Sequence, residues 1–257
     1  MKIARFSRAG SIAFGILDED EREWVLLSGD PMYSGFDTTG ERVKLADVSL
    51  LAPVLPRSKV IGIGRNYHEH AEEMGSVAPE APLMFLKPNT AVIGPDDAIV
   101  LPPQSERVEH EGELVAVIGR IAKDVTEDDA LEYVFGYTVG NDVTARDLQR
   151  ADGQWARGKG FDTFCPLGPV IETEFDASSA TIETRVNGEV RQSGKVDDLI
   201  HGIPQLVAYA SSVWTLLPGD VIMTGTPAGV GPLVAGDRVD VTVSSIGTLS
   251  NPVRAKG

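Results

Sequence analysis

Acidic side chains stand at the ends of two apolar segments of the chain. Glu111 and Glu113 lie two residues apart at the start of the apolar run 113–120, and Asp142 closes the apolar run that begins at residue 135. In a strand, Glu111 and Glu113 would project from the same face. Two unit charges about 4 Å apart repel by roughly 4 kcal/mol at an effective dielectric constant near 20. A buried pair of carboxylates therefore needs a positive charge between them.

Three hard oxygen ligands favour a Mg²⁺ or Mn²⁺ site over zinc, copper or an iron–sulfur cluster, because the chain has one cysteine and four histidines. Mg²⁺ takes six ligands and usually keeps waters, so three carboxylates would leave positions for water and a chelating substrate. A Glu-x-Glu pair taken alone is more typical of a solvated strand end. The sequence alone does not show that the three acids meet in space.

Segment 66–75 carries two histidine–glutamate pairs at helical spacing. His70 and Glu73 are three residues apart, and His68 and Glu72 are four apart, so either pair would share a helix face. A carboxylate that orients an imidazole raises its basicity and fixes its tautomer, as a general base requires. Spacing alone does not choose between the pairs, and a solvated polar helix would show the same pattern.

Glycine-rich segments supply the other candidate residues. Lys159 lies between two glycines, where it is either an exposed loop lysine or a cation directed into a site. Segment 224–232 lacks the Gly-Lys-Ser/Thr ending of a phosphate loop and does not fit the dinucleotide fingerprint. We interpret it as a tight loop that presents Thr226 and backbone N–H groups to an anion. Cys165 has no acid or base partner nearby in the sequence, which favours a buried structural thiol.

The elements that must position these residues are mostly short strands. Apolar runs bounded by turn residues predict strands over 2–6, 11–17, 22–28, 60–64, 113–120 and 135–143. Asn187-Gly188 between two alternating runs predicts a two-residue hairpin. Because strands outnumber helices and hairpins outnumber βαβ units, the pattern predicts a mostly β fold with some helix (α+β) and disfavours a doubly wound nucleotide-binding sheet.

Three helices are predicted. The first covers 66–75 and ends at Gly75, the second covers 126–134 with Thr126 as N-cap, and the third begins at residue 203 with Pro204 in its first turn. The turn-rich segment 29–56 contains prolines that break any regular element. We therefore predict a small β-rich N-terminal domain over residues 1–57 and a larger domain over residues 58–257.

Charge and composition exclude several classes of partner. The 257 residues include 23 Lys and Arg against 38 Asp and Glu, a formal net charge of −15. Such a negative field repels nucleic acids and anionic membrane surfaces. No apolar run approaches the roughly 20 residues of a membrane-spanning helix, the N-terminus lacks a signal-peptide core, and one cysteine cannot form an intrachain disulfide. These features predict a cytoplasmic protein with no nucleic-acid or membrane partner.

Seven segments, in this order, make the chain resemble the fumarylacetoacetate hydrolase family over roughly residues 58–253. They are GRNYHEHAEE, FLKPNTAVIGP, EHEGELVAVIGR, GYTVGNDVTARDLQ, GKGFDTFCPLGP, VNGEVRQ and LLPGDVIMTGTPAGVGP. The resemblance implies a mixed β-roll catalytic domain and a homodimer. The N-terminal strands resemble the small extra domain of some bacterial members.

The resemblance implies chemical roles for residues noted above. The family's metal acids match Glu111, Glu113 and Asp142. Its lid pattern, Asn-Tyr-x-x-His-x-x-Glu, selects His70 and Glu73 as the catalytic base and the acid that orients it.

The resemblance also implies which residues would contact the substrate. The family's substrate-contacting lysine matches Lys159, which we include among the catalytic residues, and its glutamine and threonine match Gln149 and Thr226. Arg65, beside the lid, would bind a substrate carboxylate. Lys87 lies within the pattern and receives no chemical role.

One departure from the family narrows the expected reaction. Larger fumarylacetoacetases have another acidic metal ligand shortly before the catalytic histidine, where this chain has Arg65 and Asn66. This favours the smaller branch acting on acylpyruvates, oxaloacetate or related 2-oxo dioates. The resemblance thus implies a Mg²⁺- or Mn²⁺-dependent enzyme that cleaves a carbon–carbon bond of a small 2-oxo acid through a metal-bound enolate. The alternatives are a 2-hydroxyhepta-2,4-diene-1,7-dioate isomerase or tautomerase, and a non-catalytic metal- or ligand-binding β-domain.

Overall fold

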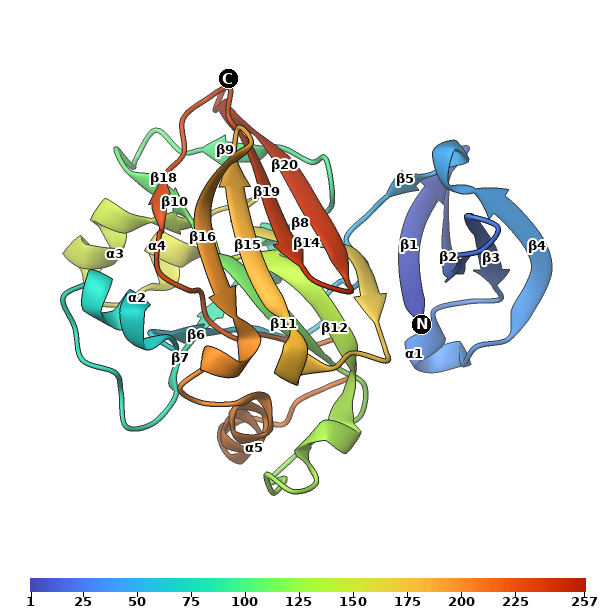
Figure 1. The fold of residues 1–257 in the computed structure, drawn as a ribbon, viewed down its shortest axis with the longest axis horizontal. Helices are drawn as coiled ribbons and strands as arrows, with labels where there is room; N and C mark the ends of the chain where they lie inside the picture. Colours follow the sequence, from blue (N-terminus) through green and yellow to red (C-terminus); the bar gives the residue numbers. More distant parts are fainter.

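The N-terminal strands form an antiparallel meander, which Figure 1 shows to one side of the rest of the chain. In the computed structural model, which describes residues 1–257, β1 (Lys2–Arg8) pairs with β2 (Ser11–Asp18). The turn residues Ala9 and Gly10 have φ angles of 48° and 83°, the left-handed geometry that suits a two-residue hairpin. The remaining elements here are β3 (Glu23–Leu27), α1 (Pro31–Ser34), β4 (Thr38–Lys44) and β5 (Ser49–Leu50).

The meander is joined to the largest sheet of the molecule. β1 pairs antiparallel with β14 (Cys165–Glu172), with Lys2 opposite Glu172. The hydrogen-bonded path therefore continues from the N-terminal strands into the strands of the larger part. The domain boundary near residue 57 stays a prediction.

Two long strands, β11 (Gly112–Ile118) and β12 (Val134–Asn141), pair antiparallel at the centre of the large sheet. Beyond β11 the sheet continues through β17 (Val221–Met223), β6 (Val60–Gly64) and β7 (Leu83–Lys87). Successive side chains of β11 enter two different apolar clusters, with Leu114 in one and Val115 in the other. Burial on both faces explains why this strand is a continuous apolar run.

A five-stranded sheet packs against one face of β11, where Ile182 and Val241 share an apolar cluster with Leu114. Asn187 and Gly188 join two of its strands with φ angles of 54° and 83°, so the predicted hairpin is confirmed. The strands, in spatial order, are β16 (Glu189–Lys195), β15 (Thr181–Val186), β19 (Arg238–Val243), β20 (Gly247–Ala255) and β9 (Ile99–Leu101).

Short ladders and turns complete the backbone. The remaining strands are β13 (Thr144–Ala145), β10 (Val108–His110) and β18 (Gly231–Pro232), which form a three-stranded sheet, and β8 (Val92–Ile93), which pairs with β14. The 3₁₀ turns are η1 (Leu45–Asp47), η2 (Asn89–Ala91), η3 (Ala130–Tyr133), η4 (Ala177–Ser179) and η5 (Val196–Asp198).

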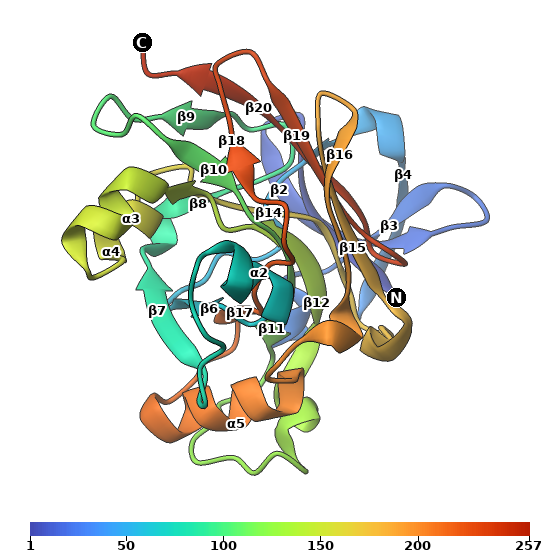
Figure 2. The same cartoon turned by 60° about the vertical axis from the view of Figure 1, so that its left-hand side comes forward.

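The helices of the larger part are short and few. Figure 2 shows α3 (Arg146–Asp152) beside α4 (Ala156–Lys159), with α2 (His68–Glu73) in front of the sheet and α5 (Ile203–Val213) apart from them. Pro204 lies in the first turn of α5, as predicted. Gly75 follows α2 with a φ angle of 67°, which supports its predicted place at the helix end.

The predicted helix over 126–134 is wrong. Only the 3₁₀ turn η3 forms there, over Ala130–Tyr133, because the chain enters β12 at Val134, where pairing with β11 takes up the residues that would have continued a helix. Short 3₁₀ turns of this kind are frequent connectors.

The predicted mostly β architecture with some helix is confirmed. None of the helices is long and apolar enough to cross a membrane.

Candidate active site

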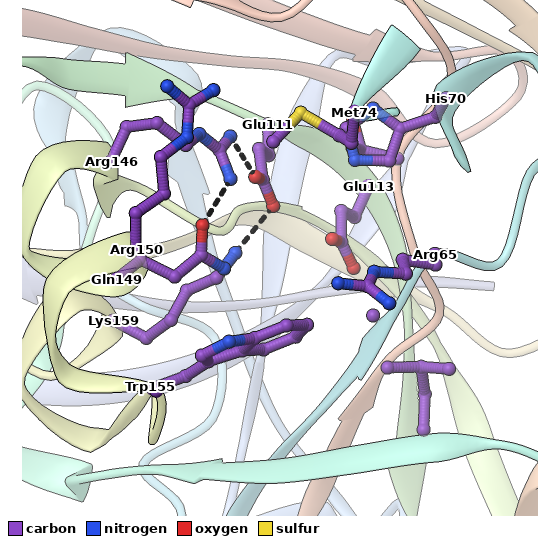
Figure 3. A pocket seen from close by; sticks show the side chains of 14 residues that line it. Arg65, His70, Met74, Glu111, Glu113, Arg146, Gln149, Arg150, Trp155 and Lys159 are labelled. Atoms are coloured by element: carbon purple, nitrogen blue, oxygen red, sulfur yellow. Dashed lines mark hydrogen bonds and ion pairs between the residues drawn. The ribbon is translucent and has the colours of Figure 1, made fainter. Parts of the chain in front are cut away.

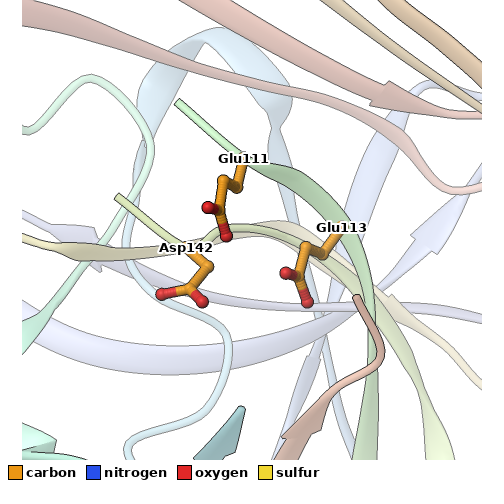
Figure 4. A group of neighbouring side chains, drawn as sticks. All are labelled: Glu111, Glu113 and Asp142. Atoms are coloured by element: carbon orange, nitrogen blue, oxygen red, sulfur yellow. The ribbon is translucent and has the colours of Figure 1, made fainter. Parts of the chain in front are cut away.

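The antiparallel pairing of β11 with β12 brings the three predicted acids together. Glu113 pairs with Gly140, and the amide of Asp142 donates to the carbonyl of Glu111 at 2.8 Å. Because side chains alternate along both strands, the three carboxylates share one face of the sheet. One oxygen from each lies within 4.8 Å of the others, and all three residues are buried (Figure 4).

Buried cations hold two of the three carboxylates. Lys159, at the end of α4, donates to Glu111 Oε2 at 2.6 Å and to Asp142 Oδ2 at 2.7 Å. Lys87, at the end of β7, pairs with the other oxygen of Asp142, and Arg146, the first residue of α3, pairs with the other oxygen of Glu111. Burial opposes the negative charge of Glu111, but the positive charges of Lys159 and Arg146 outweigh it and hold its pKa below the usual range.

Glu113 has no cationic partner among the ion pairs of the protein. Its Oε2 accepts the Gly225 N–H at 2.8 Å, and the residue is 1% exposed. Burial, together with the negative charges of Asp142 and Glu111, raises the pKa of Glu113 well above its usual value. A divalent cation would supply the counter-charge that Glu113 lacks, and carboxylate oxygens are the ligands that Mg²⁺ and Mn²⁺ prefer. The residues present therefore fit a hard divalent cation.

A histidine–glutamate pair from α2 lies beside the carboxylates. His70 Nδ1 is 3.2 Å from Glu73 Oε2, and His70 is buried, whereas His68 and Glu72 are exposed. The Glu73 carboxylate also accepts the Gly229 N–H at 3.1 and 3.2 Å, which ties α2 to segment 224–232. Because Nδ1 is engaged, Nε2 is the ring nitrogen of His70 that is left for proton transfer.

His70, Glu111, Glu113 and Lys159 line one cavity of about 290 Å³ (Figure 3), whereas Asp142 and Glu73 are not among its lining residues. Glu111 and Glu113 reach it from the central sheet, and His70 reaches it from α2. Gln149 and Lys159 line the opposite side, from α3 and α4. Short elements that are distant in sequence thus surround a single polar space.

The cavity carries positive charge that the protein does not neutralise. Arg146 and Lys159 are paired with buried carboxylates, whereas Arg65 and Arg150 line the cavity and form no ion pair. The Arg65 guanidinium lies 5.8 Å from the centre of the Trp155 ring. In a chain of net charge −15, this local excess favours an anionic ligand.

Gln149 and Thr226 line the same cavity with different capacities for hydrogen bonding. Gln149 Oε1 accepts from Arg146 at 2.6 Å, which leaves the amide N–H groups of Gln149 without a protein partner. The Thr226 hydroxyl donates to the Gly112 carbonyl at 2.8 Å and accepts from Gln192 at 2.7 Å. The single hydroxyl proton of Thr226 is therefore engaged by the Gly112 carbonyl, and the predicted contact of Thr226 with a substrate stays a prediction.

Sequence reasoning missed the role of Arg146 in holding the site together. The side chain is 2% exposed and donates to Glu109 at 2.6 Å as well as to Glu111 and Gln149. The available signal was a cation four residues after Asp142 in a polar run. Its carboxylate partners are Glu109 on β10 and Glu111, which lies between β10 and β11, and only the tertiary fold brings them to Arg146.

Arg65 and Asn66 occupy the positions where larger fumarylacetoacetases have another acidic metal ligand, and both residues have other contacts in this structure. Asn66 is fully buried; its amide donates to the carbonyls of His201 and Thr224 at 3.0 and 2.8 Å and accepts the His201 N–H at 2.8 Å. The preceding residue, Arg65, has a φ angle of 58° and directs its side chain to the cavity. Asn66 therefore anchors backbone and is not directed at the carboxylate cluster.

Cys165 is buried, as predicted, and its Sγ lies 3.8 Å from Met223 Sδ. Burial raises the pKa of the Cys165 thiol to about 12, so the thiol stays protonated and packs as an apolar group.

Comparison with known proteins agrees with this geometry. A family model described as fumarylacetoacetate (FAA) hydrolase C-terminal matches residues 59–254, and one described as Rv2993c-like, N-terminal matches residues 1–53. The chain is similar to the crystal structure of 5-carboxymethyl-2-hydroxymuconate delta-isomerase from Mycobacterium smegmatis, with 51% identity, a TM-score of 0.93 and coverage of 100% of both chains.

Two further proteins are similar over most of the chain. Oxaloacetate tautomerase YisK of Bacillus subtilis is 44% identical over 223 residues, which cover 81% of this chain and 74% of that protein. Fumarylpyruvate hydrolase from Pseudomonas aeruginosa, solved in complex with Mn²⁺ and pyruvate, has 37% identity and a TM-score of 0.74, over 81% of this chain and 92% of that one. Together with the match over residues 59–254, these similarities show that the chain belongs to the fumarylacetoacetate hydrolase family, whose members are enzymes.

Proposed function

We propose that this protein is a divalent-metal-dependent enzyme that cleaves a carbon–carbon bond of a small 2-oxo acid through an enolate, by acylpyruvate hydrolysis or oxaloacetate decarboxylation. The observation that carries the proposal is that Glu111 and Glu113, clustered with buried Asp142, line one cavity of about 290 Å³ together with His70, whose imidazole pairs with Glu73. A non-catalytic metal-binding domain would need the carboxylates but would have no use for a paired imidazole at the same cavity.

Glu111, Glu113 and Asp142 would hold Mg²⁺ or Mn²⁺. When bound, the ion would act as a Lewis acid that draws electrons from the keto group of the substrate. The complex of the Pseudomonas aeruginosa hydrolase with Mn²⁺ and pyruvate supports both this choice of cation and a 2-oxo acid as ligand.

Lys159 would stabilise a developing oxyanion. Its ammonium group has three N–H donors, and Glu111 and Asp142 occupy two of them. The third remains for a ligand in the cavity that Lys159 lines, where a charge-assisted bond would stabilise the enolate oxygen. The free N–H groups of Gln149 and the unpaired guanidinium of Arg65 would bind the substrate carboxylate.

His70 would move the proton. In acylpyruvate hydrolysis its Nε2 takes a proton from water while the water oxygen attacks the 4-oxo carbon, and Glu73 stabilises the imidazolium. The C3–C4 bond then breaks, its electron pair passes into the enolate, and the imidazolium returns the proton to C3. In oxaloacetate decarboxylation the same bond breaks as CO₂ leaves, with no attack by water, and C3 is then protonated.

A second candidate is keto–enol isomerisation, of oxaloacetate or of a 2-hydroxyhepta-2,4-diene-1,7-dioate. The similarity to an oxaloacetate tautomerase and to a hydroxymuconate isomerase favours it. In that reaction His70 would carry a proton between C3 and the enol oxygen, and no carbon–carbon bond would break.

The products distinguish these reactions. The protein is treated with EDTA, reloaded with Mg²⁺ or Mn²⁺, and incubated with oxaloacetate or acetylpyruvate. Pyruvate released with CO₂ from oxaloacetate, or with acetate from acetylpyruvate, identifies cleavage, whereas a change of ultraviolet absorbance at constant mass identifies isomerisation. Metal binding without turnover of any 2-oxo acid would contradict both proposals and favour the non-catalytic domain.

We also propose that the active protein is a homodimer, on the basis of the family resemblance. Light scattering after gel filtration should give twice the 27.5 kDa of one chain. A mass of one chain at assay concentration would contradict this expectation.

A further inference from the structure

Gln192, on β16, is a buried side chain with no role in the reaction described above. It is 1% exposed. Its Oε1 accepts the Gly112 N–H at 3.0 Å and lies 3.1 Å from His110 Nδ1, and its Nε2 donates to Thr226 Oγ1 and to the Pro227 carbonyl, each at 2.7 Å. A primary amide offers two donors and two acceptor lone pairs, so every hydrogen-bonding capacity of Gln192 is filled.

The oxygen of this amide holds the chain on both sides of Glu111. His110 is the last residue of β10 and Gly112 is the first of β11, so Glu111 is the single residue between the two partners. A Cβ atom at Gly112 would lie 2.1 Å from Thr184 Oγ1, which shows how closely β11 approaches β15 here. A shift of the Glu111 backbone would therefore break a bond to Gln192.

The nitrogen of the amide holds the loop over residues 224–232. Its acceptors, Thr226 and Pro227, are followed by Gly229, where a Cβ atom would lie 2.1 Å from the Arg191 carbonyl. Gly229 has a φ angle of 98° and donates its N–H to the Glu73 carboxylate. The same loop thus rests on β16 and reaches the partner of the catalytic histidine.

We propose that Gln192 is a positioning residue that fixes the carboxylate cluster and the His70–Glu73 pair relative to one another. It acts through the backbone at Glu111 and through the 224–232 loop, and it touches no substrate. The catalytic part of this inference rests on the proposed function.

The test is Gln192→Met, which keeps the length of the side chain and removes all four hydrogen bonds. Groups that orient metal ligands typically affect metal affinity or activity by about 10- to 100-fold. We expect a loss in that range in kcat, with KM nearly unchanged, and weaker Mn²⁺ binding by calorimetry. Gln205→Met is the matched control, because the Gln205 oxygen also lies 3.1 Å from a histidine Nδ1, that of His201, away from the cavity.

A double-mutant cycle with Glu73→Gln separates positioning from general packing. If Gln192 acts through the loop that Glu73 binds, the double variant loses less kcat than the product of the two single losses. Independent losses that multiply would overturn the proposal. So would values of kcat and Mn²⁺ affinity within twofold of the wild type, or equal losses in Gln205→Met.

A second variant keeps the proposal testable if Gln192→Met does not fold. Gln192→Glu keeps the shape and the acceptor oxygen but lacks the amide donors to Thr226 and Pro227. Hydrogen exchange should then accelerate in segment 224–232 and stay unchanged in β15, whereas unchanged exchange in the loop would overturn the proposal. If the wild-type protein turned over no 2-oxo acid, the proposed function would fail, while Mn²⁺ affinity and hydrogen exchange would still decide the role of Gln192.

Discussion

Lys159→Met removes a buried positive charge that two carboxylates share. The ammonium lies 2.6 Å from Glu111 and 2.7 Å from Asp142, with 3% of the side chain exposed. Glu111 keeps its bond to Arg146 and Asp142 keeps its bond to Lys87, so neither carboxylate is left without a cation. The loss should therefore be about 1.5 to 3 kcal/mol, the range for a hydrogen bond to a charged group, rather than the roughly 3 to 5 kcal/mol of an unpaired buried charge. At about 2 to 4 °C per kcal/mol, the metal-free variant should melt roughly 3 to 12 °C below the wild type.

Metal should reverse part of this loss of stability. A divalent cation at the three carboxylates would replace the missing positive charge, so Mn²⁺ should raise the melting temperature more in Lys159→Met than in the wild type. Activity should not recover, because the proposed donor to the enolate oxygen is absent. Loss of one such donor lowers kcat by about 10²- to 10³-fold.

The assay combines thermal melting, with EDTA and with Mn²⁺, with initial rates on 2-oxo acids at saturating Mn²⁺. Lys59→Met is the control, since Lys59 forms a comparable ion pair with buried Asp220, at 2.7 Å, outside the cavity. It should be destabilised without a matching loss of kcat in the folded protein. A normal kcat in Lys159→Met would refute contact with the reacting atoms, and unchanged metal-free stability would refute the ion-pair argument.

Three other variants test separate parts of the structure. Asp142→Asn removes a proposed metal ligand, so calorimetry should show Mn²⁺ binding weakened by about tenfold or more and turnover should vanish; full activity in EDTA would disprove the metal site. His70→Ala should lower acylpyruvate hydrolysis by about 10²-fold or more, and an unchanged rate would exclude it as the base. Gly140→Ala would place a Cβ atom 2.6 Å from Val115 Cγ2, so thermal melting should show a loss of about 1 to 3 kcal/mol, and an unchanged melting temperature would contradict this packing.

Local features of the fold were predictable where local chemistry determines them. Asn187-Gly188 forms the expected hairpin because both residues adopt left-handed backbone at low cost. The helix expected over 126–134 is only a 3₁₀ turn over Ala130–Tyr133, because the pairing of β12 with β11 begins at Val134. Local propensity does not reveal where a strand of the central sheet begins.

The sequence did not predict which segments pair across the sheets. Gln192 and Arg146 hold the site through residues on β10, β11 and the 224–232 loop, and no spacing in the chain relates these segments. Such partners are determined by strand order and register, which depend on the packing of the whole core.

The sequence by itself determined that Glu111 and Glu113 point the same way, because side chains alternate along a strand whatever surrounds it. The family resemblance, carried by the same residues, selected His70 and Glu73 over the neighbouring pair. Only the tertiary structure decided that Asp142 joins the two glutamates and that Lys159 lies between Glu111 and Asp142. The physical reason is that the shared direction of Glu111 and Glu113 depends on backbone geometry over only three residues. The positions of Asp142 and Lys159 depend instead on the antiparallel register of two strands and on the end of a helix. Both are fixed by the burial of apolar side chains far away in the chain.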